Sequence, residues 1–284
     1  MELYQIYNPL TATPFACNES YREWQPCEAL KPYIKCFWGS NVPVRQEKTD
    51  IETTGIVTPD TCMDITFHVD FTENQSRGGF CGIDDRTFET HTKNEREKVT
   101  ATYAIRFYAW SVTLFSEESM RNVRNGFFDA GEHFSKIKKE IEMQLFDITD
   151  MDRFIKIAEK VLLKQLNEEH KNNYVMEAVA KLLEHRGCVR AESLAKELHI
   201  SNRQLERLFR EYIGVSPKSM ASMVRYQYLW NEVLFIPKFD VQDAVLRYGY
   251  TDQAHLLHEF KKFHSMNITE AKRYALKDVA FLQA

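Results

Sequence analysis

The most regular spacing of hydrophobic positions lies in the C-terminal part of the chain, where two stretches share one layout. In residues 192–217 and again in residues 240–263, apolar positions recur at helical spacing before and after a tight turn. Ser201 in the first stretch, and Thr251 or Asp252 in the second, precede the second helix and can cap its free N–H groups. A short helix, a turn and a capped second helix predict a helix-turn-helix motif, present twice.

The second helix of each motif presents a polar face opposite its apolar stripe. An ordinary solvated face explains one such helix, but two motifs in one helical run favour DNA binding. Arg, Asn and Gln near a helix N-terminus can pair with base edges in the major groove, and Lys or Arg farther along meets phosphates. We therefore expect DNA contacts from Ser201, Asn202, Arg203, Glu206, Arg207, Arg210, Thr251, Gln253, His255, His258 and Lys262.

Both motifs resemble those of a known family. Ile200–Met220 and Gly249–Phe263 are similar to the first and second motif signatures of AraC-type transcription regulators, and the likeness covers residues 175–277. It implies a regulator that binds double-stranded DNA, responds to a small-molecule effector and usually pairs as a homodimer, with RNA polymerase as a further candidate partner. Ser265 and Ile268 stand where this family usually has glycine and proline.

The N-terminal part of the chain has the alternation typical of β-strands. Its short segments are rich in β-branched and aromatic residues and are separated by glycines. Several short strands at this spacing predict a sandwich or a small barrel. The segments are residues 33–39, 62–69, 79–83, 99–107 and 108–115.

Landmarks in residues 20–115 also resemble the sensing half of a subgroup of these regulators. The matching segments are residues 30–38, 57–65 and 105–107. Thr61 replaces a frequent glycine of the Pro-Asp-Gly-Cys pattern. The resemblance implies a cupin-like domain with the ligand pocket inside it, and from it we expect effector contacts at Trp38, Asp60, Asp64, Phe67 and Arg106.

From residue 117 the pattern becomes helical. Ser116 or Ser119 can cap the first helix, and residues 149–166 form one amphipathic helix before a polar linker. We expect an α+β protein: a cupin-like β-barrel or sandwich with a helical extension, then an all-α domain with two helix-turn-helix motifs. The predicted divisions are a sensing domain at residues 1–116, a helical extension for candidate dimerisation plus linker at 117–173, and a DNA-binding domain at 174–284.

Charge is distributed unequally between the two parts. The whole chain has a net charge of -4, but residues 174–284 carry 16 Lys and Arg against 13 Asp and Glu, and residues 1–173 carry 21 against 28. DNA affinity would therefore rest on local clusters rather than on a broad basic field. The chain has neither a long apolar run nor a signal-peptide pattern at its start, so no membrane association and a cytoplasmic location are expected.

Other classes of function have weaker support. The six cysteines form no close pair, which favours buried free thiols over a metal site or an alkyl-accepting repair site and leaves a thiol-sensing regulator as an alternative. A cupin-like metalloenzyme would need clustered ligands, whereas His68, His91 and His133 lie far apart in sequence. A pure protein-interaction module would not need two base-reading faces. We expect no enzyme, no cofactor and no metal.

Overall fold

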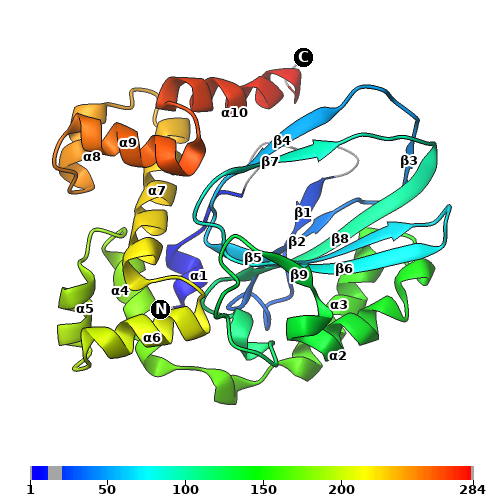
Figure 1. Ribbon diagram of the computed structural model, residues 1–284, viewed down its shortest axis with the longest axis horizontal. Helices are drawn as coiled ribbons and strands as arrows, with labels where there is room; N and C mark the ends of the chain where they lie inside the picture. The colour runs from blue at the N-terminus through cyan, green and yellow to red at the C-terminus, as the bar shows by residue number, and fades with distance from the viewer. Residues whose placement is uncertain (1, 12–20, 283–284) are drawn as a thin grey trace.

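An antiparallel sheet forms most of the N-terminal half of the molecule, and a group of helices forms the C-terminal half (Figure 1). This arrangement confirms the predicted α+β class. The computed structural model describes residues 2–11 and 21–282. Within these ranges no helix is long and apolar enough to cross a lipid bilayer.

Seven strands make up the larger sheet. Each pairs antiparallel with its neighbours, and the central pair β5 and β8 places Ile65 opposite Ile105. β3, Val44–Gln46, pairs with the outer end of β8. In spatial order the remaining strands are β1 (Arg22–Trp24), β2 (Ile34–Gly39), β8 (Lys98–Tyr108), β5 (Cys62–Asp70), β6 (Gln75–Cys81) and β9 (Phe127–Asp129).

A second sheet of two strands lies opposite the first. β4, Thr53–Val57, pairs with β7, Phe88–Thr92, and Figure 1 shows this ribbon above the larger sheet. In the described part of the chain the two sheets remain separate ladders. The expected barrel or sandwich is therefore realised as two facing sheets and not as a closed barrel.

Alternation along β5 explains why the larger sheet is buried on both faces. The ring centroids of Phe67 and Phe154 lie 6.2 Å apart, so one face of the sheet packs on a helical layer. Asp64 and Thr66, the intervening residues, line a cavity between the two sheets. The helical layer consists of α2 (Gly131–Glu142), the short η2 (Leu145–Asp147) and α3 (Met151–Gln165).

Two local predictions in the N-terminal half are wrong. Of the predicted strand at residues 108–115, only Tyr108 is in a strand, as the end of β8, and the rest forms a turn and a short 3₁₀ helix, η1 (Val112–Leu114). The Ser111 hydroxyl donates to the carbonyls of Tyr33 and Tyr108, which fixes the turn. Ser116 and Ser119 cap no long helix, because α2 begins only at Gly131. Burial of apolar side chains in a turn overrode their β-propensity.

Within the described residues, seven helices follow the short η3 (Glu168–His170). They enclose a core around the central helix α7, and the predicted connector at residues 216–234 matches it. The small N-terminal helix α1, Leu3–Ile6, lies against the first of them. They are α4 (Asn173–Glu184), α5 (Ala191–Glu197), α6 (Asn202–Tyr212), α7 (Pro217–Phe235), α8 (Val241–Arg247), α9 (Gln253–His264) and α10 (Ile268–Leu282).

Candidate DNA-binding surface and ligand cavity

The first helix-turn-helix motif consists of α5 and α6. Leu194 and Ala195 bury the inner face of α5, and the turn that follows has His199 in the left-handed region at φ 54°. Ser201 then caps α6 by accepting the Gln204 N–H at 3.1 Å. Ser201 is therefore the N-cap of α6, as the capping pattern predicts.

The outward face of α6 carries the predicted contact residues. Asn202, Arg203, Arg207 and Arg210 are exposed, and Glu206 is half-buried. Two of the three arginines pair along the helix, because Arg207 lies 2.9 Å from Glu211 and Arg210 lies 3.7 Å from Glu206. Arg203 has no ion pair among the described residues, which leaves its guanidinium the most available of the three.

The second motif repeats the layout with different capping residues. Asp240 caps α8 by accepting the N–H groups of Gln242 and Asp243, and Gly249 makes the turn at φ 64°. Asp252, and not Thr251, caps α9: it accepts the His255 N–H at 2.7 Å. The predicted contact residues Thr251, Gln253, His255, His258 and Lys262 are all exposed.

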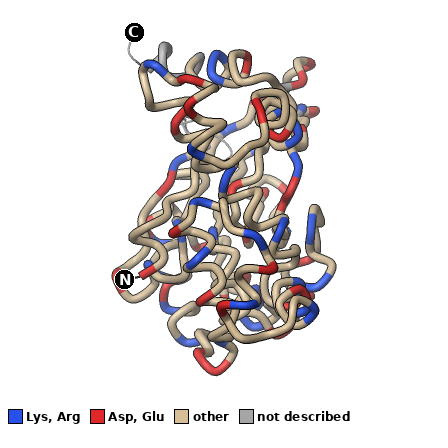
Figure 2. The backbone as a smooth tube through the Cα atoms, turned by 90° about the vertical axis from the view of Figure 1, so that its left-hand side faces the viewer, with Lys and Arg blue, Asp and Glu red and all other residues tan. Residues whose placement is uncertain are grey.

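α7 holds both motifs in a fixed relation. Its 19 residues span about 28 Å at 1.5 Å per residue, which is comparable to the roughly 34 Å between successive major grooves on one DNA face. Figure 1 shows α6 and α9 towards opposite ends of α7. Arg225 of α7 donates to both carboxylate oxygens of Glu259 in α9, at 2.8 and 2.9 Å. Figure 2, viewed from the helical side, shows basic and acidic residues interspersed.

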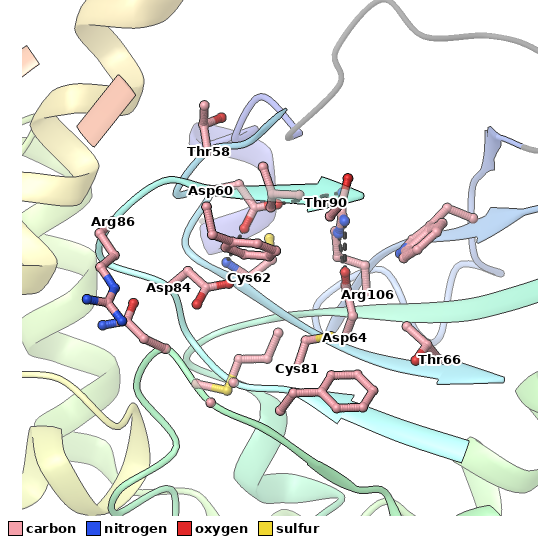
Figure 3. Close-up of a pocket in the computed structure, with 18 of the residues that line it drawn as sticks. Thr58, Asp60, Cys62, Asp64, Thr66, Cys81, Asp84, Arg86, Thr90 and Arg106 are labelled. Carbon is pink, nitrogen blue, oxygen red and sulfur yellow. Dashed lines mark hydrogen bonds and ion pairs between the residues drawn. The ribbon is translucent and has the colours of Figure 1, made fainter. Parts of the chain in front are cut away.

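A cavity of about 660 Å³ lies between the two sheets of the N-terminal half. Four of the five predicted effector contacts line it: Trp38, Asp60, Asp64 and Arg106. Phe67 does not, because its side chain lies on the opposite face of β5 against α3. Sequence reasoning missed other lining residues, including Asp84 and Thr90, since they come from the β6–β7 connection and from β7, which was not predicted (Figure 3).

A buried ion pair forms one wall of this cavity. Arg106 on β8 donates to Asp64 on β5 through Nε at 2.9 Å and Nη2 at 2.8 Å, and the two residues are direct partners in the strand register. Its Nη1 lies 3.6 Å from Asp60 and 3.8 Å from Glu23. The Trp38 ring lies 5.5 Å from the guanidinium. One cation thus faces three carboxylates.

Two carboxyl groups of the cavity, those of Asp60 and Asp84, have raised pKa values. Burial raises the pKa of Asp60 to about 6 although Arg106 opposes the shift. Burial, reinforced by the charges of Asp60 and Asp64, raises the pKa of Asp84 to about 7. Both carboxyls are therefore harder to ionise than a free aspartate, at a cavity that three aspartates and two arginines line.

Thr61, at the edge of the cavity, has a strained backbone. Its φ of 61° lies in the left-handed region, where a β-branched residue is rare and glycine is the usual choice. The Thr61 hydroxyl hydrogen-bonds Tyr7 at 3.0 Å. The glycine that is frequent at this position of the sequence pattern therefore corresponds to a left-handed backbone conformation, which Thr61 also adopts here.

Gln227 of α7 links the cavity wall to the helical half. Its Nε2 donates to the carbonyl of Pro59 at 2.6 Å, and its Oε1 accepts the Leu10 N–H at 2.8 Å. Pro59 precedes the cavity residue Asp60. Thr87, in the β6–β7 connection, donates to the carbonyl of Phe263 in α9. A buried glutamine inside a helix gives no sequence signal for this role, because its partners are distant in the chain.

The cysteines and histidines offer little chemistry. Burial raises the pKa values of Cys36, Cys62 and Cys81, which disfavours the thiolate that a thiol sensor requires; Cys17 lies outside the described residues. His68 contacts Thr102, and His133 packs against Phe80. Within residues 2–11 and 21–282, His, Cys, Asp and Glu form no group suited to a metal ion.

Comparison with known proteins divides the chain in two. Residues 194–274 match a family described as a helix-turn-helix domain, which confirms the expected AraC-type DNA-binding domain in this part of the chain. Residues 22–129 match a family described as a domain of unknown function, DUF6597. No curated protein sequence matches the chain.

Solved structures similar to this chain include regulators from two bacteria. ToxT from Vibrio cholerae is 14% identical, with 82% of this chain and 96% of that chain covered at a TM-score of 0.39. ToxT with bound unsaturated fatty acid is 12% identical, with 83% and 94% covered at 0.35. A probable AraC family transcriptional regulator from Rhodopseudomonas palustris is 24% identical, with 35% and 97% covered at 0.29.

Proposed function

We propose that this chain, whose C-terminal part is an AraC-type helix-turn-helix domain, is a sequence-specific transcription regulator with an N-terminal domain that senses a small molecule. The observation that carries the proposal is the pair of capped motifs on one connector, each with its polar face exposed. In this reading Arg203 and Arg207 read base edges and Lys262 holds phosphate. The proposal assigns no catalytic step.

The cavity between the sheets is the proposed effector site. Trp38, Asp60, Asp64 and Arg106 line it, and the hydrogen bond from Gln227 to Pro59 attaches its edge to α7. A ligand that favours one position of the residue 59–60 segment would thereby favour one arrangement of the helical half. Such a ligand shifts the population between DNA-competent and incompetent arrangements by its differential affinity for the two.

Pairing of two chains is part of the proposal. α3 carries an apolar stripe whose inner residues, such as Phe154 and Leu162, are buried in its own domain. Leu163, on the same helix, remains 46% exposed, and Met143 after α2 is 67% exposed. Both are available to a second copy. Sedimentation of the wild type and of Leu163→Glu measures this directly, with a dimer expected only for the wild type.

Selection of duplex DNA from a random-site pool by the full-length chain tests the DNA-binding function. We expect one enriched site, bound with a salt dependence of about -0.9 in the log–log slope for each phosphate contact. The variant Arg203→Ala should bind the enriched site more weakly and with relaxed base choice. Failure to enrich any sequence, or affinity independent of salt, contradicts a DNA-binding function.

A further inference from the structure

The chemical class of the ligand can be argued from the charges that the cavity leaves available. Two arginines line it, Arg106 and Arg86, against three aspartates, Asp60, Asp64 and Asp84 (Figure 3). The preference of the cavity depends on which of these charged groups are free of protein partners and open to a ligand.

The charge of Arg106 is already shared by carboxylates of the protein. Only 5% of the residue is exposed, and two of its nitrogens bond the carboxylate of Asp64. Its third nitrogen, Nη1, is buried without a hydrogen bond and lies 3.6 Å from Asp60 and 3.8 Å from Glu23. A ligand carboxylate that approached this guanidinium would be a fourth anion around one cation.

Asp84 is in the opposite situation. It lines the cavity and is only partly buried, and it has neither a hydrogen bond nor an ion pair among the described residues. The nearby cation, Arg86, is itself exposed to solvent. Asp60 and Asp64 add repulsion to the cost of burying Asp84, which raises its pKa to about 7. This unpaired acid is the group that a bound cation would relieve most.

A second buried polar group on the cavity wall also lacks a partner. Thr66 is 3% exposed, lines the cavity beside Asp64, and its hydroxyl has no hydrogen-bond partner in the described part of the chain. Buried hydroxyls are normally hydrogen-bonded, and an unsatisfied one costs about 1–3 kcal/mol. The hydroxyl can accept a hydrogen bond from a ligand nitrogen once side chains adjust around it.

The remaining walls suit an apolar or aromatic body. Tyr21 and Trp38 lie with their ring centroids 5.3 Å apart, and both line the cavity with Phe88 and Phe127. The last two are 42% and 51% exposed, although they are large apolar side chains. Aromatic faces attract cations as well as apolar groups.

We propose that this cavity selects an organic cation, a protonated amine on an apolar or aromatic body, whose positive charge lies beside Asp84 and Asp60. The inference rests on the proposed function and specifies its effector. It takes an amine in preference to an alcohol, because only a charge compensates the unpaired carboxylate. It disfavours the matching carboxylate, because three carboxylates already face Arg106 and Asp84 repels another anion.

Matched ligand triplets test this directly on the full-length chain. Each triplet shares one carbon skeleton and differs in its charge: 4-phenylbutylamine, 4-phenylbutanol and 4-phenylbutyrate, and tryptamine, tryptophol and indole-3-acetate. At pH 8 we expect dissociation constants from thermal shift and calorimetry to be roughly tenfold lower for the amine than for the alcohol, or about 1.4 kcal/mol. The carboxylate should be the weakest of each triplet.

Two variants locate the interaction. Asp84→Asn should abolish the preference for the amine, because Asp84 has no other partner that the substitution disturbs. Glu89→Gln is the control: this acid lies on the same strand as Phe88 and Thr90 and is exposed, but it does not line the cavity. It should keep the wild-type order. An amine preference that survives Asp84→Asn overturns the proposal.

Three further outcomes each give a decisive answer. Equal affinity for amine and alcohol, tightest binding of the carboxylate, or no binding of either triplet at millimolar concentration overturns the cation class. Affinity for the selected DNA site, measured with and without each ligand, keeps the two proposals apart. If a carboxylate binds and changes DNA affinity, the proposal of an effector-responsive regulator stands and the proposal of a cationic effector is wrong. Loss of all DNA binding would remove the regulator itself.

Discussion

The ion pair in the N-terminal cavity is buried, whereas the ion pairs on the outward face of α6 are exposed. Arg106 and Asp64 meet at 2.8 Å with 6% and 12% of their side chains exposed. On α6, Arg207 meets Glu211 at 2.9 Å with 54% and 31% exposed. The first pair is enclosed by protein, whereas the second can exchange its partner for a phosphate or a base.

Unsatisfied polar atoms follow the same division. Among the described residues, Trp38, Thr66, Tyr103, Arg106, Trp110 and His133 hold such atoms in the N-terminal half, and Tyr248 alone does so in the C-terminal half. Three of them, Trp38, Thr66 and Arg106, line the cavity. Buried polar groups without partners cost stability and concentrate where a protein binds something. Half of the unsatisfied groups of the N-terminal half therefore lie at the proposed effector site.

Removing the buried cation should have the largest effect on stability. Arg106→Ala leaves Asp64 and Asp60 buried without compensation, and we expect a loss of about 3–5 kcal/mol in the free energy of unfolding. Arg45→Ala is the control, because the pair of Arg45 with Glu97 is largely exposed and should contribute at most about 1 kcal/mol. Urea denaturation of both variants measures the difference. Equal losses would mean that burial does not set the energetic contribution of these two ion pairs.

Removing an exposed arginine of α6 should instead affect DNA binding. Arg203→Ala should change the free energy of unfolding by about 0.5 kcal/mol or less, because the side chain is solvated, and should weaken binding to the selected site by about 1–3 kcal/mol. Lys262→Ala should weaken all sequences alike and lower the salt slope by about one unit. Titrations against the selected and a scrambled site measure both. Equal losses on both DNAs for Arg203→Ala would make that residue a phosphate contact.

Local sequence signals predicted the helical half well. Ser201 caps α6 as predicted, and Gly249 makes the second turn. These interactions join residues a few positions apart, so a single sequence contains them. Thr251 and Asp252 were both possible caps, and only geometry decided for Asp252.

The cavity could be predicted only in part. Trp38, Asp60, Asp64 and Arg106 were expected there from the resemblance, but the resemblance did not say which face of β5 each residue occupies. Phe67 shows the limit: it is three residues from Asp64 along β5, and odd and even positions point to opposite faces. Pairings between distant segments, such as Gln227 with Pro59, leave no local pattern at all.

The two halves should respond to pH in opposite senses. Asp84 has a folded-state pKa of about 7, above its ordinary value, so acidification from pH 8 to 5 protonates the folded state first and stabilises it. Burial lowers the pKa of His264 to about 4, so the same acidification protonates the unfolded state first and destabilises the fold. We expect each contribution to be on the order of 1–2 kcal/mol, given solvent access to the cavity.

Two variants separate these contributions. Asp84→Asn removes the stabilisation on acidification, so its free energy of unfolding should fall more steeply than that of the wild type between pH 8 and 5. His264→Gln removes the opposing contribution and should show a shallower fall or a gain. Denaturation at the two pH values gives both slopes. Parallel slopes in all three proteins would contradict the assignment of either group.

The smallest effects concern two residues that adopt a glycine-like backbone, one in each half. Thr61 has φ 61° and Ser265 has φ 60°, and both stand where the family usually has glycine. The left-handed conformation costs an L-residue about 1–2 kcal/mol. Replacement by glycine removes this cost, but the larger unfolded-state entropy of glycine offsets about 0.5–1 kcal/mol of the gain.

Ser265 is exposed and its hydroxyl has no hydrogen bond in the described part of the chain, so Ser265→Gly should stabilise the protein by about 0.5–1 kcal/mol. The Thr61 hydroxyl instead bonds Tyr7, a contact that contributes about 1 kcal/mol, so Thr61→Gly should gain nothing or lose stability. Thermal unfolding of the two glycine variants compares them directly, and a similar gain from both would show that the hydrogen bond to Tyr7 does not offset the strain beside the cavity.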